Sequence, residues 1–199
     1  MDEPNRARGM SLVEIMVVLG VVGIAALVTL PNLIQYQVRA RLMNPLRDIE
    51  RLSSVARLQA LNRGSQGVLA FLQDGVTDEF TGQPFSGQNG VVIFLDANNN
   101  GLWDGAEPIA GRYAVVDPVA YRRPSGSMPI EATNYRVIFG PTGAIVGGAE
   151  ATIYLGDERG NFVRLVFNRV TGQVRREKNV PETSDWLGAG REQDWRWLY

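Results

Sequence analysis

The 199-residue chain contains no cysteine and no histidine, and Lys178 is its only lysine. Without cysteine the chain has neither a disulfide framework nor a thiolate metal site. Without histidine it lacks the commonest general base, the commonest metal ligand and the usual activator of a nucleophilic serine. The carboxylates form no recognisable catalytic pair, so the composition argues against an enzyme.

Charge is also sparse near the N-terminus, where residues 10–30 contain one charged side chain, Glu14, in a largely apolar run. A helix of roughly 20 apolar residues crosses a bilayer core of about 30 Å, so we expect residues 10–30 to be transmembrane. An ionisable group at that depth costs several kcal/mol and usually has a functional partner. We therefore expect Glu14 to pair with a charge.

The apolar run follows a short polar leader, residues 1–9, which ends in Gly9. This junction resembles the class III signal of type IV pilins and type II secretion pseudopilins. In that family a membrane-embedded prepilin peptidase cuts after a Gly and methylates the new N-terminal residue. The resemblance implies cleavage between Gly9 and Met10, which makes Glu14 the fifth mature residue, as the family requires. Pro31 also falls where pilin helices commonly carry Pro.

Two other interpretations of this segment fit less well. A secretory signal has an apolar region of about 7–15 residues followed by a small-residue cleavage site, and the run here is longer. A plain signal anchor has no use for Glu14 or for a Gly directly before the run. Within the pilin class, Met10 stands where major pilins usually have Phe, and many major pilins have a disulfide. Both differences indicate a minor subunit.

Beyond Pro31, apolar residues recur every three or four positions, which predicts a helix over residues 10–62 with one stripe packed on a sheet. Pro31 and Pro45 each remove a backbone hydrogen bond and are expected to bend or break this helix. Gly64 is expected to cap it in the left-handed conformation. The stripe consists of Val38, Leu42, Leu46, Ile49, Leu52, Val55, Leu58 and Leu61.

Gly20 and Gly23 lie inside the apolar run, where Gly disfavours a helix by about 0.5–1 kcal/mol relative to Ala. The pilin resemblance implies that the segment from Gly20 to Pro31 unwinds in an assembled filament. Close packing between helices is the alternative for Gly23. The predicted assembly residues of the N-terminal helix are therefore Glu14, Gly20, Gly23 and Pro31.

Residues 63–199 are rich in Gly, Val and Thr with regularly spaced turn dipeptides, which predicts a globular head of antiparallel strands. The predicted fold class is therefore α+β, a long N-terminal helix packed on an antiparallel sheet. The late Thr-Gly-Gln-Val-Arg at 171–175 and the order of elements resemble the GspH/FimT/FimU group of minor pilins and pseudopilins. Strands are expected at 68–72, 91–95, 112–116, 135–139, 151–155, 162–167 and 173–176.

The segment from Asp96 to Glu107 fits the pattern of an EF-hand calcium loop. Gly101 would make the sharp turn, and two of the side-chain ligands are neutral Asn, which predicts weak affinity in the 10⁻⁴–10⁻³ M range. A strand precedes the loop, so no helix pair frames it. The alternative is a metal-free hairpin loop rich in Asn, Asp and Gly, in which Glu107 is a surface residue. The calcium ligands would be Asp96, Asn98, Asn100, Leu102 through its carbonyl, Asp104 and Glu107.

The C-terminal segment holds Trp186, Trp195 and Trp197. Tryptophan and arginine are enriched at protein interfaces, yet such a tail also packs over the edge of its own domain. The sequence leaves both alternatives open.

The resemblance implies a minor pilin or pseudopilin that initiates or caps a type IV pilus or a type II secretion pseudopilus. It implies a single-pass inner-membrane protein with a periplasmic head, whose partners are prepilin peptidase and other minor subunits. The alternative function is a calcium-dependent adhesive or binding module on the same stalk. No other cofactor is expected. Nucleic acid is not an expected partner, because the arginines of residues 32–63 are scattered round a helix.

Overall fold

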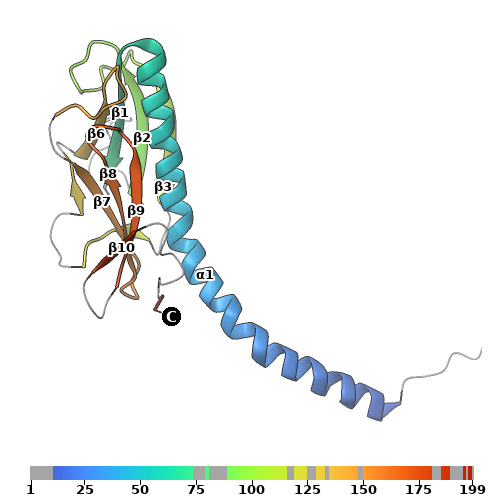
Figure 1. Cartoon of the computed structure of the whole chain (residues 1–199). Coiled ribbons are helices and arrows are strands. Elements are labelled where there is room, and N and C mark those ends of the chain that lie inside the picture. Colours follow the sequence, from blue (N-terminus) through green and yellow to red (C-terminus); the bar gives the residue numbers. More distant parts are fainter. Residues whose placement is uncertain are drawn as a thin grey trace, which may run out of the picture.

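The computed structural model describes residues 11–73, 79–80, 89–115, 119–124, 129–132, 135–147, 150–180, 185–188, 195 and 197–198. One long helix, α1 (Leu12–Arg63), leads into a head of antiparallel strands (Figure 1). The predicted α+β class is confirmed, and the helix bounds lie within two residues of those expected.

Helix α1 has well-defined ends. The side-chain oxygen of Ser11 accepts a hydrogen bond from the N–H of Val13 at 3.3 Å, and the carboxylate of Glu14 accepts one from the N–H of Ser11 at 2.8 Å. This is a capping box, which satisfies two of the unpaired N–H groups of a helix start. At the other end Gly64 adopts φ 64°, the predicted left-handed cap.

Of the two effects predicted for proline, a bend or a break, the break is absent, because α1 is continuous through both Pro31 and Pro45. Each proline removes one hydrogen bond, and the rest of a 52-residue ladder stays in place. The bending that proline allows is present, since Figure 1 shows α1 curving away from the head in its N-terminal half.

The described strands form two sheets rather than the single sheet expected. The first has the order β3-β2-β1-β6, and the second has the order β10-β9-β8-β7-β4, with β5 also paired to β7. The first sheet contains β1 (Gln66–Leu72), β2 (Asn89–Asp96), β3 (Ile109–Val115) and β6 (Arg136–Phe139). The second contains β4 (Ala120–Tyr121), β5 (Ile130–Glu131), β7 (Ala151–Gly156), β8 (Phe162–Phe167), β9 (Val174–Asn179) and β10 (Trp186–Gly188).

All seven predicted strands exist, and β4, β5 and β10 were missed because two or three residues carry no measurable periodicity. Hairpin turns at 156–160 and 170–172 join β7 to β8 and β8 to β9. After β6 the chain turns back on itself, and Ile145 pairs with Phe139 in an isolated antiparallel bridge.

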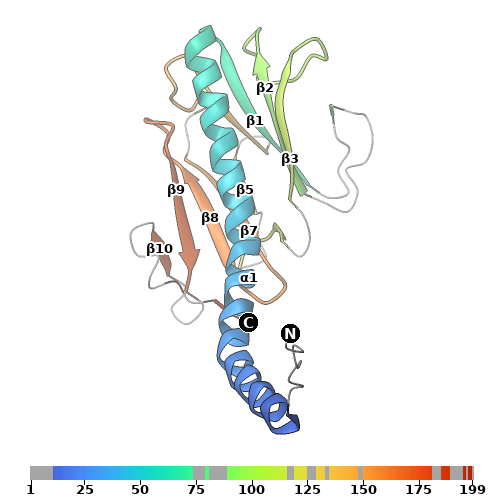
Figure 2. The same ribbon diagram turned by 90° about the vertical axis from the view of Figure 1, so that its right-hand side faces the viewer.

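The C-terminal half of α1 lies across both sheets, with the first sheet on one side and the second on the other (Figure 2). Leu42, Leu46 and Ile49 are fully buried in one core with strands of both sheets. A second, smaller cluster on the other face of the first sheet contains Val68, Ala70 and Phe94, with Phe80 and Trp103 packed on it.

The predicted apolar stripe is wrong at its C-terminal end, where Leu58 and Leu61 are 56% and 42% exposed. The buried residues of these turns are Ala56 and Ala60. A Cβ on Gly67 of β1 would lie 2.2 Å from the carbonyl oxygen of Ala56. Strand and helix backbones therefore approach so closely that only small side chains fit between them.

Candidate assembly interface and loop site

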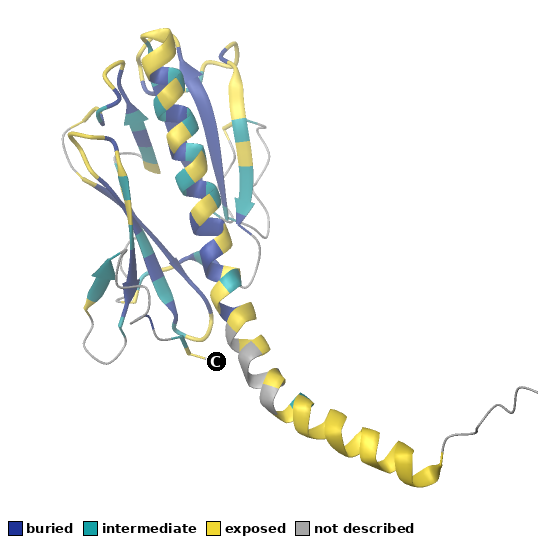
Figure 3. Cartoon of the chain, turned by 45° about the vertical axis from the view of Figure 1, so that its right-hand side comes forward, coloured by how far each residue is buried: buried dark blue, intermediate teal, exposed yellow. Residues whose placement is uncertain are grey.

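The N-terminal half of α1 has no covering layer within the described chain. Apart from the half-buried Ala26, its apolar side chains from Leu12 to Leu27 are exposed, with values of 73% and 75% at these two ends, whereas Val38 is 4% exposed (Figure 3). Apolar surface left in water costs roughly 25 cal/mol per Å². A helix half of this kind needs a partner, and it is the candidate interface of the molecule.

In the described residues no helix combines the length and the apolar character required to cross a membrane.

The predicted assembly residues are arranged along this half of α1. Glu14 lies in the first turn, where its carboxylate bonds the N–H of Ser11 and a negative charge interacts favourably with the helix dipole. Gly20 and Gly23 have open space around them, since a Cβ at either would meet no atom within 4 Å. The segment from Gly20 to Pro31 is helical here, and its unwinding in an assembly remains a prediction. The predicted processing residues, Gly9 and Met10, lie outside the described residues.

The loop from Asp96 to Glu107 is held closed by its own side chains. The carboxylate of Asp96, which is fully buried, accepts the N–H of Gly101 at 2.6 Å and that of Asn100 at 3.2 Å. The carboxylate of Glu107 accepts the N–H of Ala97 at 2.7 Å and that of Asp104 at 3.4 Å. Positive φ values at Asn99, Gly101 and Gly105 complete the turns.

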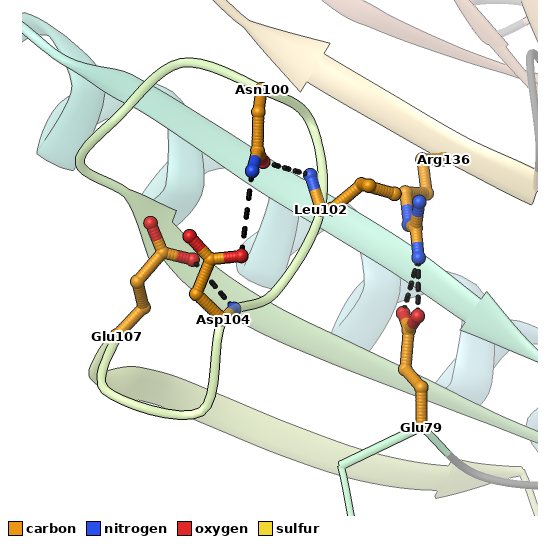
Figure 4. Close-up of polar contacts among 6 residues, drawn as sticks. All are labelled: Glu79, Asn100, Leu102, Asp104, Glu107 and Arg136. Carbon is orange, nitrogen blue, oxygen red and sulfur yellow. Dashed lines mark hydrogen bonds and ion pairs between the residues drawn. The ribbon is translucent and has the colours of Figure 1, made fainter.

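Side chains of the same loop also bond one another (Figure 4). The side-chain oxygen of Asn100 accepts the N–H of Leu102 at 2.6 Å, and its amide donates to Asp104 at 3.4 Å. Asn98 donates to the other carboxylate oxygen of Asp104. The structure thus holds all five predicted ligand side chains in one hydrogen-bonded loop, and the sixth predicted ligand, Leu102, was expected to contribute only its carbonyl.

This arrangement supports the hairpin interpretation, because the oxygens that would bind calcium accept N–H groups instead. Among the described residues, no group of three or more carboxylate-type ligands is placed to hold a metal ion. One part of the hairpin interpretation is wrong, since Glu107 is 9% exposed and not a surface residue. Calcium binding itself remains a prediction.

An ion pair beside the loop was not predicted from the sequence. Arg136 on β6 contacts both carboxylate oxygens of Glu79, which lies fifty-seven positions earlier in the chain (Figure 4). Next to Glu79, the ring of Phe80 lies 5.6 Å from that of Phe94 and 5.2 Å from that of Trp103. These contacts cover the outer face of the first sheet, and no sequence pattern pairs residues so far apart.

The C-terminal segment packs on its own head, which is the second of the two alternatives for the tryptophans. Trp195 is 6% exposed and its ring centroid lies 6.4 Å from that of Trp197. The amine of Lys178 lies 5.0 Å from the centre of the Trp197 ring and donates to the carbonyl of Asn179 at 2.9 Å. Trp186 on β10 packs edge-on against Tyr154 at 5.5 Å.

The burial of Lys178, the only lysine of the chain, was also not predicted from the sequence. It is fully buried on β9, and burial lowers its pKa from 10.5 to about 8, an effect partly opposed by the negative charge of Asp157. Its place in a five-residue polar run, residues 175–179, gave no sign of burial.

Comparison with known proteins adds two matches. A family model described as the prokaryotic N-terminal methylation motif matches residues 4–30, and one described as type II transport protein GspH matches residues 46–172. No curated protein and no solved structure matches the chain.

Proposed function

The chain belongs to the GspH family of type II transport proteins, and on this premise we propose that it is a minor pseudopilin or minor pilin, anchored in the inner membrane before assembly. Proteins of this family are structural subunits, and the N-terminal methylation motif is the signal for processing by prepilin peptidase. The proposal adds that this chain initiates or caps a pseudopilus or pilus and has no catalytic role.

The observation that carries the proposal is the contrast between the two halves of α1. The half from Leu12 to Leu27 is exposed and apolar, whereas the half from Val38 onward is buried against the head. In this proposal, lipid covers the exposed half while the protein is anchored in the membrane, and the helices of neighbouring subunits cover it after assembly. Both environments are apolar, so one surface serves both without exposure to water.

Glu14 has a specific role in this proposal. Cleavage after Gly9 would create a positively charged amine at Met10, and Glu14 lies in the first turn of α1. We propose that the carboxylate of Glu14 pairs with the terminal amine of a neighbouring subunit and sets the axial register of the two helices. Two unit charges about 4 Å apart attract by about 4 kcal/mol at an effective dielectric of 20, before desolvation. A single buried charge without its partner would cost several kcal/mol.

The proposal is tested by cross-linking within the exposed half of α1. The chain has no cysteine, so one Cys introduced at Leu19 reacts alone. In cells that express the companion pilin-like subunits, each with one Cys in its own N-terminal helix, we expect a cross-linked pair that contains this chain. The matched control is Cys at Arg51, an exposed position in the C-terminal half of α1, which packs on the head. Cross-links at Arg51 but not at Leu19 would contradict assembly through the N-terminal half.

A further inference from the structure

The end of the head from which the exposed half of α1 emerges brings together residues that are distant in the sequence. A groove of about 150 Å³ is lined there by Val38 and Arg41 of α1 and by residues 157–159 of the β7–β8 turn. Figure 1 shows the C-terminus at the same end of the head. We call Arg41, Arg122, Arg159 and Leu198 the basal surface.

Leu198 is held in this surface by a buried polar group. The side-chain oxygen of Asn161 accepts the N–H of Leu198 at 2.7 Å, and its amide donates to the carbonyl of Leu198 at 2.9 Å and to Asp157 at 2.8 Å. Asn161 is fully buried. The Asn161 side chain therefore hydrogen-bonds both the N–H and the carbonyl of Leu198, as a paired β-strand would. The apolar side chain of Leu198 stays 43% exposed.

Among the described residues that line or adjoin the groove, the charges that face outward are mainly positive. Arg41, Arg122 and Arg159 are exposed. Arg122 directly follows β4 and donates to the carbonyl of Asp157 in the β7–β8 turn at 3.5 Å. The carboxylate of Asp157 is turned inward, where it accepts the N–H groups of Arg159 at 3.0 Å and Asn161 at 2.8 Å. Glu158 is the exposed acidic side chain of the groove.

The basal surface directly continues the exposed apolar half of α1. Leu33, Ile34 and Tyr36 are 53%, 49% and 70% exposed, and burial begins at Val38. The exposed apolar surface thus continues past residue 30, where the expected span ends, as far as Ile34. At 1.5 Å per residue, Arg41 lies about 10–11 Å along the axis from Ile34 and about 7–8 Å from Tyr36. The interfacial layer on each side of a bilayer core is roughly 5–8 Å thick, and tyrosine commonly lies within it.

From this geometry we infer that the basal surface binds anionic phospholipid headgroups of the membrane that holds α1. The arginines contact lipid phosphates, and Leu198 inserts among the headgroups beside them. The inference rests on the proposed membrane residence and adds a second contact, which orients the head on the bilayer. Each arginine near an anionic surface contributes about fivefold to the equilibrium between bound and free head, and salt weakens the attraction.

Spin labelling of the full chain, reconstituted at one copy per lipid nanodisc, tests this inference. Single Cys labels at Leu198, at Leu19 and at Leu61 report the basal surface, the apolar half of α1 and the far end of the helix. In discs that contain phosphatidylglycerol, we expect the Leu198 label to be shielded from a water-soluble relaxation agent. We expect this shielding to fall in pure phosphatidylcholine and at high salt, and the Leu61 label to stay accessible throughout.

The double variant Arg41→Gln, Arg159→Gln should weaken the shielding at Leu198 by about 25-fold in the underlying equilibrium, from about fivefold per arginine. The matched control is Arg63→Gln, Arg169→Gln, which changes two exposed arginines at the other end of the head and should leave the shielding unchanged.

Four outcomes would overturn the inference. A Leu198 label in water while the Leu19 label is in lipid would refute the basal contact and leave the membrane anchor standing. Shielding of Leu198 that does not change with lipid charge or with the arginine variants would refute headgroup binding. Shielding that occurs only with a companion subunit present would show that the basal surface contacts a protein instead. A Leu19 label in water would refute the anchor, and the basal contact with it.

Discussion

The carboxylate of Glu14 accepts a hydrogen bond from the main-chain N–H of Ser11 at 2.8 Å, so the proposed charge partner is also a helix cap. Both roles are lost in Glu14→Ala. Gln at this position retains the capping box, because its side chain also accepts from the N–H, but it has no charge. The pair of variants therefore separates the two roles.

We expect both Glu14→Ala and Glu14→Gln to be cleaved after Gly9 and inserted, since loss of a charge favours the bilayer. Both should fail to join the pilus or pseudopilus, as measured by cross-linking to companion subunits. The cap alone contributes about 1 kcal/mol to helix stability. If Glu14→Gln assembles as well as the natural chain, the charge pair is wrong and capping suffices.

We expect processing to depend on Gly9, because a residue without a Cβ leaves the peptidase room at the proposed cut. Gly9→Val is expected to keep the full precursor in the membrane and to abolish assembly, as shown by gel mobility and N-terminal sequencing. Met10→Phe is the matched control, because Phe is usual at this position in major pilins and should be cleaved normally. An assembled protein that starts anywhere but Met10 would contradict the class III signal.

The loop prediction concerns Glu107, whose carboxylate accepts the N–H of Ala97 and of Asp104. Glu107→Ala removes two part-buried, charge-assisted hydrogen bonds that close the loop, so unfolding free energy should fall by about 1–3 kcal/mol even without calcium. Glu158→Ala, at an exposed carboxylate, should change it by less than about 0.5 kcal/mol.

Calcium is tested in the same experiment by melting each protein in chelator and in millimolar calcium. The hairpin interpretation expects no shift in melting temperature for the natural chain. A calcium-dependent rise that Glu107→Ala removes would instead establish the metal site.

From the burial of Lys178 we expect the free energy of unfolding to depend on pH. Its folded pKa of about 8 lies below the ordinary 10.5, so above pH 8 the unfolded chain binds more protons than the folded chain. Stability should therefore rise between about pH 8 and 10.5, by at most on the order of 3 kcal/mol. Lys178→Met, of similar length and uncharged, should lack this rise in urea unfolding of the detergent-solubilised chain.

Tyrosines oppose the lysine effect at the top of this range. Burial, with the nearby charge of Asp48, raises the pKa of Tyr113 to about 12, and burial raises that of Tyr121 well above 10. Both lower stability above about pH 10, equally in the two proteins. Parallel pH curves for the natural chain and Lys178→Met would refute the lysine assignment.

Local sequence determined those features that depend on neighbouring residues. The Ser11 cap, the Gly64 cap and the hairpin at 156–160 follow from the conformational preferences of a few adjacent residues, and the seven longer strands follow from composition between turns. The exposed apolar half of α1, with Glu14 as its one charge, is equally a property of consecutive residues.

Tertiary structure alone decided features that depend on contacts across the chain. The division into two sheets, the burial of Lys178 and the exposure of Leu58 and Leu61 all depend on how closely α1 approaches each strand. The close contact of Gly67 with Ala56 sets that approach, and the clamp of Asn161 on Leu198 joins residues thirty-seven positions apart. Burial is a property of the packed whole, so no local pattern could have specified it.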